Sequence, residues 1–254
     1  MGLPIASRLR AQGEEGGAIG SPVQDGTPLD TASQSWDREY RLGRYRAEPP
    51  VPFVRHIQKV LGRRPEIGKG KGLYIGCGNG RNFIPLCDEG LDLWGLDVSS
   101  EALEQLRSNR PDIAHRLIHS DLDDFESNSL FDYVIAIQVF QHGSEETVRS
   151  MFARAGGLLR GGGLLFVRVN SASTEVYHPH EVIERTDSGG FTARYTGGPK
   201  TGLSIHFLSR IGLESIVGKR FAAIEPVAEQ IMPREAPKHG SWAQWEGVWA
   251  KGRP

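Results

Sequence analysis

Cysteine and long apolar runs are both scarce in this chain of 254 residues. The two cysteines, Cys77 and Cys87, are too few for a disulfide framework or for a zinc site built from cysteine. No apolar run is long enough to span a bilayer, and the start MGLPIASRLR lacks the apolar core of a secretory signal peptide. We therefore expect a cytoplasmic protein with no membrane partner.

An excess of charge of either sign is also missing. The chain has 30 Lys and Arg against 31 Asp and Glu, which gives a formal net charge of −1. Domains that coat nucleic acid are usually more basic, so the balance disfavours a nucleic-acid partner, although it leaves room for a local basic patch. The length suits one large α/β domain better than two.

The first sixty residues divide into two parts. Residues 1–33 are rich in Gly, Pro, Ser and Gln and poor in apolar side chains, which predicts a disordered tail. Residues 34–62 contain two stretches with helical periodicity, separated by AEPPVPF. In the first stretch Trp36 and Tyr40 are four residues apart and therefore share one helical face. We expect residues 34–62 to form an N-terminal helical lid.

From residue 71 onward, short apolar runs alternate with helical patterns. Strands are expected at 71–75, 91–97, 115–119, 131–137 and 161–169, and helices at 81–90, 99–109 and 144–160. Apolar strands separated by helices predict a parallel sheet covered on both faces. Residues 171–208 form a polar insert, followed by a short helix at 209–218 and two final strands at 220–228 and 241–251.

Three glycines stand at the end of the first expected strand, Gly76, Gly78 and Gly80. Ligands of such sheets bind at the carboxyl ends of the strands, and glycine allows a backbone to approach a ligand closely. The dinucleotide fingerprint G-x-G-x-x-G requires a glycine at position 81, where this chain has Arg81, so the spacing disfavours an NAD or FAD site. The alternative interpretation is a tight turn without a ligand.

Acidic residues follow the second and third strands. Asp97 ends the second strand, where a carboxylate can accept hydrogen bonds from both hydroxyls of a ribose; alternatively it caps the helix that starts near Ser99. Asp121 follows the third strand, but it also lies in a charge run with Asp123 and Asp124. The glycine turn and both carboxylates stand at successive strand ends, which together indicate one binding site.

With these motifs the chain resembles the class I S-adenosylmethionine-dependent methyltransferases, most closely over residues 70–170. YIGCGNG is similar to the first motif of that family, FDYVIAIQVFQH to its fourth-strand motif, and LLRGGGLLFVRV to its glycine turn into the fifth strand. SWAQWEGVWAK resembles its final antiparallel strand. The resemblance implies a Rossmann-like α/β fold: a seven-stranded, mostly parallel sheet of order 3-2-1-4-5-7-6, with the last strand antiparallel and helices on both faces.

The resemblance also implies S-adenosyl-L-methionine as the cofactor. By family position, Asp97 would bind the ribose hydroxyls, Asp121 and Leu122 the adenine, and Gln138 and Val139 the methionine part. The residues expected to contact the cofactor are Tyr45, Gly76, Cys77, Gly78, Gly80, Asn82, Asp97, Val98, Ser120, Asp121, Leu122, Gln138 and Val139.

Transfer of a sulfonium methyl is an in-line displacement by an O, N, S or C atom of the acceptor. The protein mainly aligns the partners and excludes water, so no catalytic triad is required. His142 is our candidate for a general base; the alternative is a histidine that ties the loop to the next helix. Trp36, Tyr40 and Tyr45 either form an aromatic lid over the sulfonium or pack the first helix onto the domain.

The acceptor is expected to be a small molecule. The chain has IQVFQ where methyltransferases of base amino groups carry [DNS]-P-P-[FYW], and it lacks the cysteines of arsenite methyltransferases and the paired-glutamate loop of protein arginine methyltransferases. It resembles the small-molecule branch that includes the type 11 and tellurite-resistance-like groups. The insert 171–208 and residues 226–240 would build the acceptor pocket. They supply His178, Arg194, Tyr195, Lys200, His206 and Arg234.

Several further interpretations stay open at this stage. Arg168 and Asn170, at the end of the fifth strand, either contact the acceptor or pair within the loop. His178 and His180 lack a clear third ligand, so no metal is expected. A cofactor-binding regulatory module, a macromolecular acceptor and, least supported, a nucleotide-dependent oxidoreductase are the alternative functions. The oligomeric state does not follow from the sequence.

Overall fold

The structure is a computed structural model, and it describes residues 32–46 and 48–253. The tail predicted for residues 1–33 lies outside the described part except for its last two residues, which begin helix α1 (Ala32–Arg41). The lid region continues with helix α2 (Phe53–Gly62) and the short helix α3 (Pro65–Gly68). One face of α2 is apolar and buried, as its periodicity predicts.

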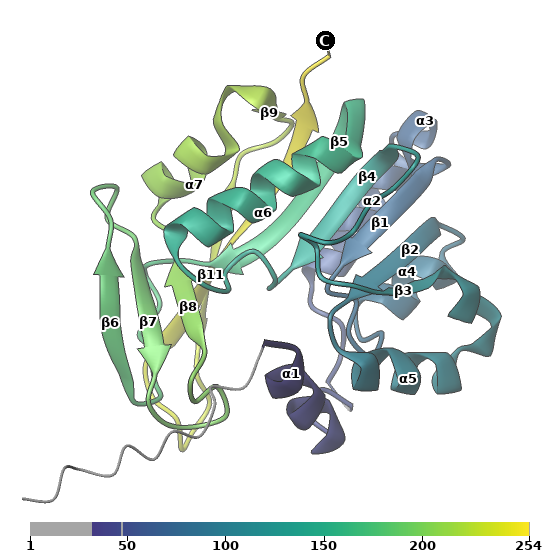
Figure 1. The fold of residues 1–254 in the computed structure, drawn as a ribbon. Helices are drawn as coiled ribbons and strands as arrows, with labels where there is room; N and C mark the ends of the chain where they lie inside the picture. Colours follow the sequence, from purple (N-terminus) through teal and green to yellow (C-terminus); the bar gives the residue numbers. More distant parts are fainter. Residues whose placement is uncertain (1–31, 47, 254) are drawn as a thin grey trace, which may run out of the picture.

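An eight-stranded sheet forms the centre of the molecule (Figure 1). Its order is β10-β11-β5-β4-β1-β2-β3, with β9 also paired to β11. The five strands that run parallel are β1 (Lys71–Ile75), β2 (Asp92–Asp97), β3 (Leu117–His119), β4 (Phe131–Ile137) and β5 (Leu159–Asn170). Strand β11 (Ser241–Lys251) is antiparallel to β5. The predicted Rossmann-like order is therefore confirmed.

The edge of the sheet beyond β11 differs from the prediction. The strand expected at 220–228 is only β9 (Phe221–Ala223), and a separate strand β10 (Ala228–Pro233) lies within residues 226–240, which we expected to help build the acceptor pocket. Both pair antiparallel with β11. Pro226 lies between them and has no N–H for a strand ladder, so the edge strand is split.

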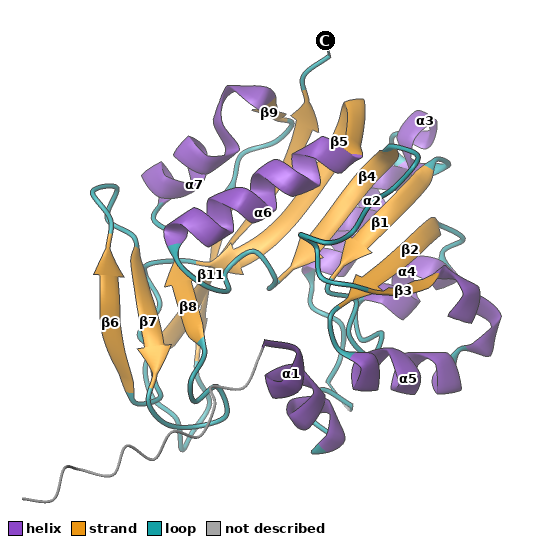
Figure 2. Cartoon of the chain, in the orientation of Figure 1, coloured by secondary structure: helices purple, strands orange, loops and turns teal. Residues whose placement is uncertain are grey.

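Helices cover both faces of the sheet, as Figure 2 shows in purple against the orange strands. On one face α2, α4 (Phe83–Asp88) and α5 (Ser100–Asn109) bury their apolar side chains, and on the other α6 (Glu145–Leu158) and α7 (Arg210–Val217) do so. Ser99, Ser144 and Ser209 cap α5, α6 and α7 by accepting a hydrogen bond from a backbone N–H of the first turn. Two short 3-10 helices, η1 (Pro111–Arg116) and η2 (Gly218–Arg220), complete these connections.

The insert at 171–208 forms a small sheet of its own, which the sequence did not predict. It consists of β6 (His180–Arg185), β7 (Phe191–Tyr195) and β8 (Ser204–Phe207) in that order. Strand β8 joins it to the loop after β4: Gly143 N donates to Ser204 O at 2.9 Å, and His206 N donates to Gln141 O at 2.7 Å. The insert therefore stands beside the carboxyl end of β4 (Figure 1). Among the described residues, no helix is long and apolar enough to cross a membrane.

Candidate active site

The glycine turn after β1 has the backbone that its composition predicts. Gly76, Gly78 and Gly80 have φ values of +71°, +55° and +96°, all in the region that favours glycine. A Cβ at Gly76 would overlap the side chain of Val139, and one at Gly80 would lie 2.6 Å from Leu106 Cδ1. The turn therefore packs directly against the β4 loop and α5, and no larger residue fits without displacing a neighbour.

Asp97 lies inside this turn rather than at its surface. Its Oδ2 accepts a hydrogen bond from Gly78 N at 2.6 Å, and its Oδ1 accepts one from Ser99 N at 2.8 Å. Burial raises the pKa of the carboxyl, while these two backbone donors oppose that shift. Ser99, and not Asp97, caps helix α5, because its hydroxyl accepts a hydrogen bond from Ala102 N at 3.1 Å. Asp97 thus couples the glycine turn to the start of α5.

The residues expected at the adenine lie on the loop after β3. Asp121 is exposed, and its Oδ1 accepts a hydrogen bond from Asp123 N at 3.0 Å, while Leu122 is buried in the core. Ser120 N donates to Asp97 O at 3.1 Å, which places this loop next to the end of β2. The exposure of Asp121 fits both interpretations, a residue that faces a ligand and a residue of a solvated charge run. Its cofactor role therefore stays a prediction.

Two expected cofactor residues are engaged within the protein. Asn82 Oδ1 accepts a hydrogen bond from Val51 N at 3.0 Å, and Val98 O accepts from Ser33 Oγ at 2.9 Å. Burial raises the pKa of the Cys77 thiol, so this side chain stays protonated inside the turn. These residues shape the site through backbone and packing.

The loop after β4 carries an unusual backbone conformation near the site. Gln138 has a φ of +61°, which is unusual for a residue other than glycine, and its N–H donates to Arg168 O at 2.7 Å. Strain of this kind clusters at functional sites. It turns the chain sharply, so that Val139 meets the glycine turn and His142 follows under the lid.

His142 is held as a neutral imidazole. Burial, with Lys200 as the second cause, lowers its pKa to about 4, although a hydrogen bond to the Gln138 carbonyl opposes that shift. A neutral ring is the form that can accept a proton, but a low pKa makes it a weak base. The edge of His142 packs against Trp36 with ring centroids 5.3 Å apart. Its assignment as a general base stays a prediction.

The predicted aromatic cluster is present on and after α1. Tyr45 has a φ of +67°, and its ring centroid is 5.7 Å from that of Tyr40 and 6.5 Å from that of Trp36. The Tyr40 hydroxyl lies where a Cβ of Gly78 would be. Figure 1 shows α1 beneath the carboxyl ends of the parallel strands and beside α5. The helix therefore covers the glycine turn, and its role as a lid stays a prediction.

Sequence reasoning missed the residue that fastens α1 to α5, Asp37. Its Oδ1 accepts hydrogen bonds from Ser99 Oγ at 2.6 Å and from Glu101 N at 3.1 Å. Burial raises the pKa of the Asp37 carboxyl, but these donors outweigh burial and lower it. The carboxylate is therefore charged at the N-terminus of α5, where the helix dipole favours an anion. Gln105 adds a hydrogen bond from its Nε2 to Tyr40 O at 3.0 Å. No local pattern marks a contact between segments more than sixty residues apart.

Arg81, which replaces the third glycine of the dinucleotide fingerprint, binds the segment that precedes α2. Its Nε donates to Pro49 O at 2.7 Å, and its guanidinium pairs with Glu48. It thereby holds residues 48–51, between the lid helix and α2, against the glycine turn. A glycine at this position would release that segment.

Other predicted pocket residues are engaged away from the turn. His180 Nδ1 lies 2.9 Å from His178 O, and Arg234 donates to the carbonyls of Ser241 and Glu175 at 2.8 and 2.6 Å. Within residues 32–46 and 48–253, no three His, Cys, Asp or Glu side chains are grouped to hold a metal ion. The predicted roles of these residues at an acceptor have no support from their contacts.

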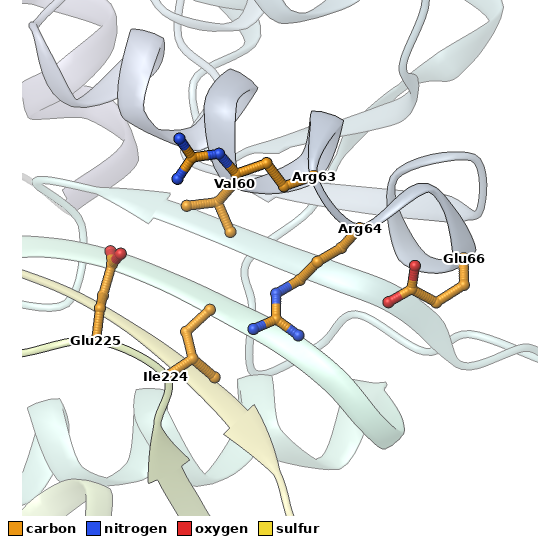
Figure 3. A pocket seen from close by; sticks show the side chains of 6 residues that line it. All are labelled: Val60, Arg63, Arg64, Glu66, Ile224 and Glu225. Carbon is orange, nitrogen blue, oxygen red and sulfur yellow. The ribbon is translucent and has the colours of Figure 1, made fainter.

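A surface pocket of about 350 Å³ lies elsewhere, at the amino end of the strands (Figure 3). Arg63, Arg64 and Glu66 line it from the end of α2 and from α3, and Ile224 and Glu225 line it from the segment after β9. Ligands of parallel α/β sheets bind at the opposite, carboxyl edge. We therefore assign the site to the glycine turn and not to this pocket.

The fold and the strand-end loops define a Rossmann-like domain of the class I methyltransferase type. A family model described as "Methyltransferase domain" matches residues 73–165. Those residues contain the glycine turn, Asp97, Asp121 and the β4 loop, so the match to a methyltransferase domain covers the candidate site.

Comparison with known proteins agrees with this identification. The "Ubiquinone biosynthesis O-methyltransferase" of Rickettsia felis is 21% identical over 144 residues, which are 56% of this chain and 58% of that relative. The chain thus spans less than two thirds of the curated relative it matches.

Two solved structures share the fold. The CcbJ methyltransferase from Streptomyces caelestis superposes with a TM-score of 0.59 and 14% identity, covering 86% of this chain and 98% of the other. The 1,6-didemethyltoxoflavin-N1-methyltransferase of Burkholderia thailandensis gives 0.60 and 16%, with 85% and 84% covered. Identities this low carry the fold and not the substrate.

Proposed function

We propose that this protein is an S-adenosylmethionine-dependent methyltransferase that acts on a small molecule. The observation that carries the proposal is the turn at Gly76–Gly80: its three glycines have positive φ, and a buried carboxylate, Asp97, lies directly behind it. A nucleoside suits such a place, because glycine lets a backbone approach a ligand closely and a carboxylate can accept from two hydroxyls. When bound, S-adenosyl-L-methionine supplies an activated methyl group on sulfur.

The chain's own residues would then position the acceptor and exclude water. Trp36, Tyr40 and Tyr45 cluster over the turn, and the face of an aromatic ring attracts a cation. The acceptor atom, O, N, S or C, would approach from the side of β4 and β5, in line with the bond that breaks. His142 is placed to accept a proton if the acceptor carries one.

A small acceptor is favoured by the location of the insert. Strand β8 is bonded to the loop that carries His142, so the small sheet would enclose an acceptor beside the methyl group. The printed names of two relatives, a ubiquinone biosynthesis O-methyltransferase and a didemethyltoxoflavin N1-methyltransferase, also concern small molecules. Neither name identifies the acceptor of this chain, and the tellurite-resistance-like branch stays a prediction.

The first test is calorimetric titration of the full chain with S-adenosylhomocysteine. We expect micromolar binding, and an affinity loss of more than tenfold in Asp97→Asn, because hydrogen bonds to a charged group are worth about 1.5–3 kcal/mol. Asp112→Asn is the matched control, since Asp112 is an exposed carboxylate paired with Arg110 near the amino end of β2. Equal affinities of both variants would refute the assigned site.

A second measurement separates an enzyme from a binding module. The protein is incubated with S-adenosylmethionine and the small-molecule fraction of a cell extract, and S-adenosylhomocysteine is quantified. An enzyme releases more of it with the fraction than without it. A protein that binds the cofactor but gives no such difference across extracts would instead support the regulatory interpretation.

A further inference from the structure

A buried polar cluster lies at the carboxyl end of β5, next to the proposed methyl-transfer site. It consists of Arg168 and Asn170 on β5 and Gln244 and Glu246 on β11. The register pairs Arg168 with Glu246 and Asn170 with Gln244. Because side chains alternate along a strand, all four project from the same face of the sheet. Arg168 and Gln244 are 2% and 0% exposed.

Most hydrogen-bonding groups of this cluster are satisfied. Arg168 Nε donates to Glu246 Oε1 at 2.8 Å, and Gln244 Nε2 donates to Asn170 Oδ1 at 3.0 Å. Asn170 N donates to the side-chain carbonyl of Gln141 at 2.9 Å, so the cluster continues into the loop of His142. It is thus built into the candidate active site.

Two atoms of the cluster are unpartnered among all residues that the structure describes, Arg168 Nη1 and Gln244 Oε1. A buried polar group without a partner costs about 1–3 kcal/mol, and such groups are rare in folded proteins. One of these atoms is a donor and the other an acceptor. Arg168 and Gln244 are diagonal neighbours across the paired strands β5 and β11. Long side chains can span the distance between such positions.

We infer that Arg168 and Gln244 bind the acceptor of the methyl group through a neutral, planar N–H and C=O edge, such as that of a lactam or amide. Arg168 Nη1 would donate to the carbonyl, and Gln244 Oε1 would accept from the N–H. Trp242 and Met232 lie on the same face beside Arg168 and are only half-buried. Because the two unpartnered atoms are themselves enclosed, these apolar side chains would move aside to admit a flat ring and then pack against it. This inference rests on the proposed function and names the chemical class of its acceptor.

A neutral group fits better than an anion because the charge of Arg168 is already paired. Glu246 contacts its Nε, and the ion pair has no net charge. A second carboxylate would be buried next to Glu246, and two like charges at this depth are costly. A lactam adds no charge and satisfies both unpartnered atoms.

The test uses three ring compounds of similar size as probes: 2-pyridone, N-methyl-2-pyridone and benzoate. Each is titrated into the full chain saturated with S-adenosylhomocysteine and followed by ligand-observed NMR. We expect 2-pyridone to bind and N-methyl-2-pyridone, which has lost the N–H donor, to bind at least tenfold more weakly. In Gln244→Met this preference should disappear, whereas Gln58→Met, a matched change on α2 where Gln58 bonds to Pro85 O, should keep it.

The outcomes separate this inference from the function on which it rests. The lactam site alone is refuted if the protein binds S-adenosylhomocysteine but binds both pyridones equally, binds neither, or binds benzoate more tightly. A protein that does not bind S-adenosylhomocysteine overturns the proposed function. If Gln244→Met does not fold, Arg168→Gln, which removes the donor, and the pair of pyridones on the unmodified chain still decide the question.

Discussion

Replacing Gly78 by alanine tests whether the lid and the glycine turn work together. The position has a φ of +55°, where an alanine is strained by about 1–2 kcal/mol. The new methyl group would also overlap the hydroxyl of Tyr40 on the lid helix. Gly90→Ala is the matched control, because Gly90 has a φ of +82° but open space around its Cβ position.

Urea unfolding and titration with S-adenosylhomocysteine measure the two effects separately. Gly90→Ala should lose about 1–2 kcal/mol of unfolding free energy and keep its affinity, because it carries only the backbone strain. Gly78→Ala should lose at least as much stability and also more than tenfold in affinity, because Tyr40 must leave the turn. A tenfold loss corresponds to about 1.4 kcal/mol.

A double variant identifies the cause of the affinity loss. The Cβ position of Gly78 is 3.3 Å from Cζ of Tyr40, so removal of the hydroxyl in Tyr40→Phe relieves most of the overlap. Gly78→Ala/Tyr40→Phe should therefore regain part of the affinity that Gly78→Ala loses. If Gly78→Ala binds as tightly as Gly90→Ala, the coupling of lid and turn is refuted. If the double variant regains nothing, the methyl group acts on the ligand and not on the lid.

Three more predictions follow from the same contacts. The imidazole of His142, with its pKa lowered to about 4, stays neutral when the chain is folded, whereas the unfolded one takes a proton below about 6.5. Unfolding free energy should therefore fall between pH 6.5 and 4, by about 2–3 kcal/mol more in the native chain than in His142→Gln in urea titrations; equal pH dependence would contradict this burial. Asp37→Asn should weaken S-adenosylhomocysteine binding about threefold to tenfold and speed proteolysis before residue 46, because the charged acceptor for Ser99 and the N–H groups of α5 is lost; unchanged proteolysis would separate Asp37 from the lid. Arg81→Met should raise hydrogen exchange at the amides of Glu48 and Val51, which flank the two prolines, without unfolding the domain, and unchanged exchange would show that Pro49 is held by other contacts.

The local pattern of the sequence predicts most of the sheet and the turn. Strands β1 and β4 begin and end where their apolar runs do, because each is buried on both faces. The serine before α5 predicts its start, since a capping hydroxyl acts within three residues. The glycines mark a turn with positive φ because glycine alone enters that region at low cost.

The small sheet of the insert could not be predicted from such patterns. Strands β6 and β7 are short and partly exposed, and they pair across turns rich in Gly and Thr, so they carry no clear alternation of apolar and polar residues. The split at Pro226 followed from the sequence only once β11 had been located as the partner of both pieces.

What the sequence determined by itself is therefore the strand-end chemistry: three glycines, Asp97 and the loop that carries His142. Only the tertiary structure brought Asp37 to the start of α5, and only the register of β5 against β11 left Arg168 and Gln244 each with an unpartnered atom. The physical reason is the range of the interactions. Turn geometry and caps depend on residues within a few positions, whereas a hydrogen bond between segments 60 to 80 residues apart depends on how the whole chain packs.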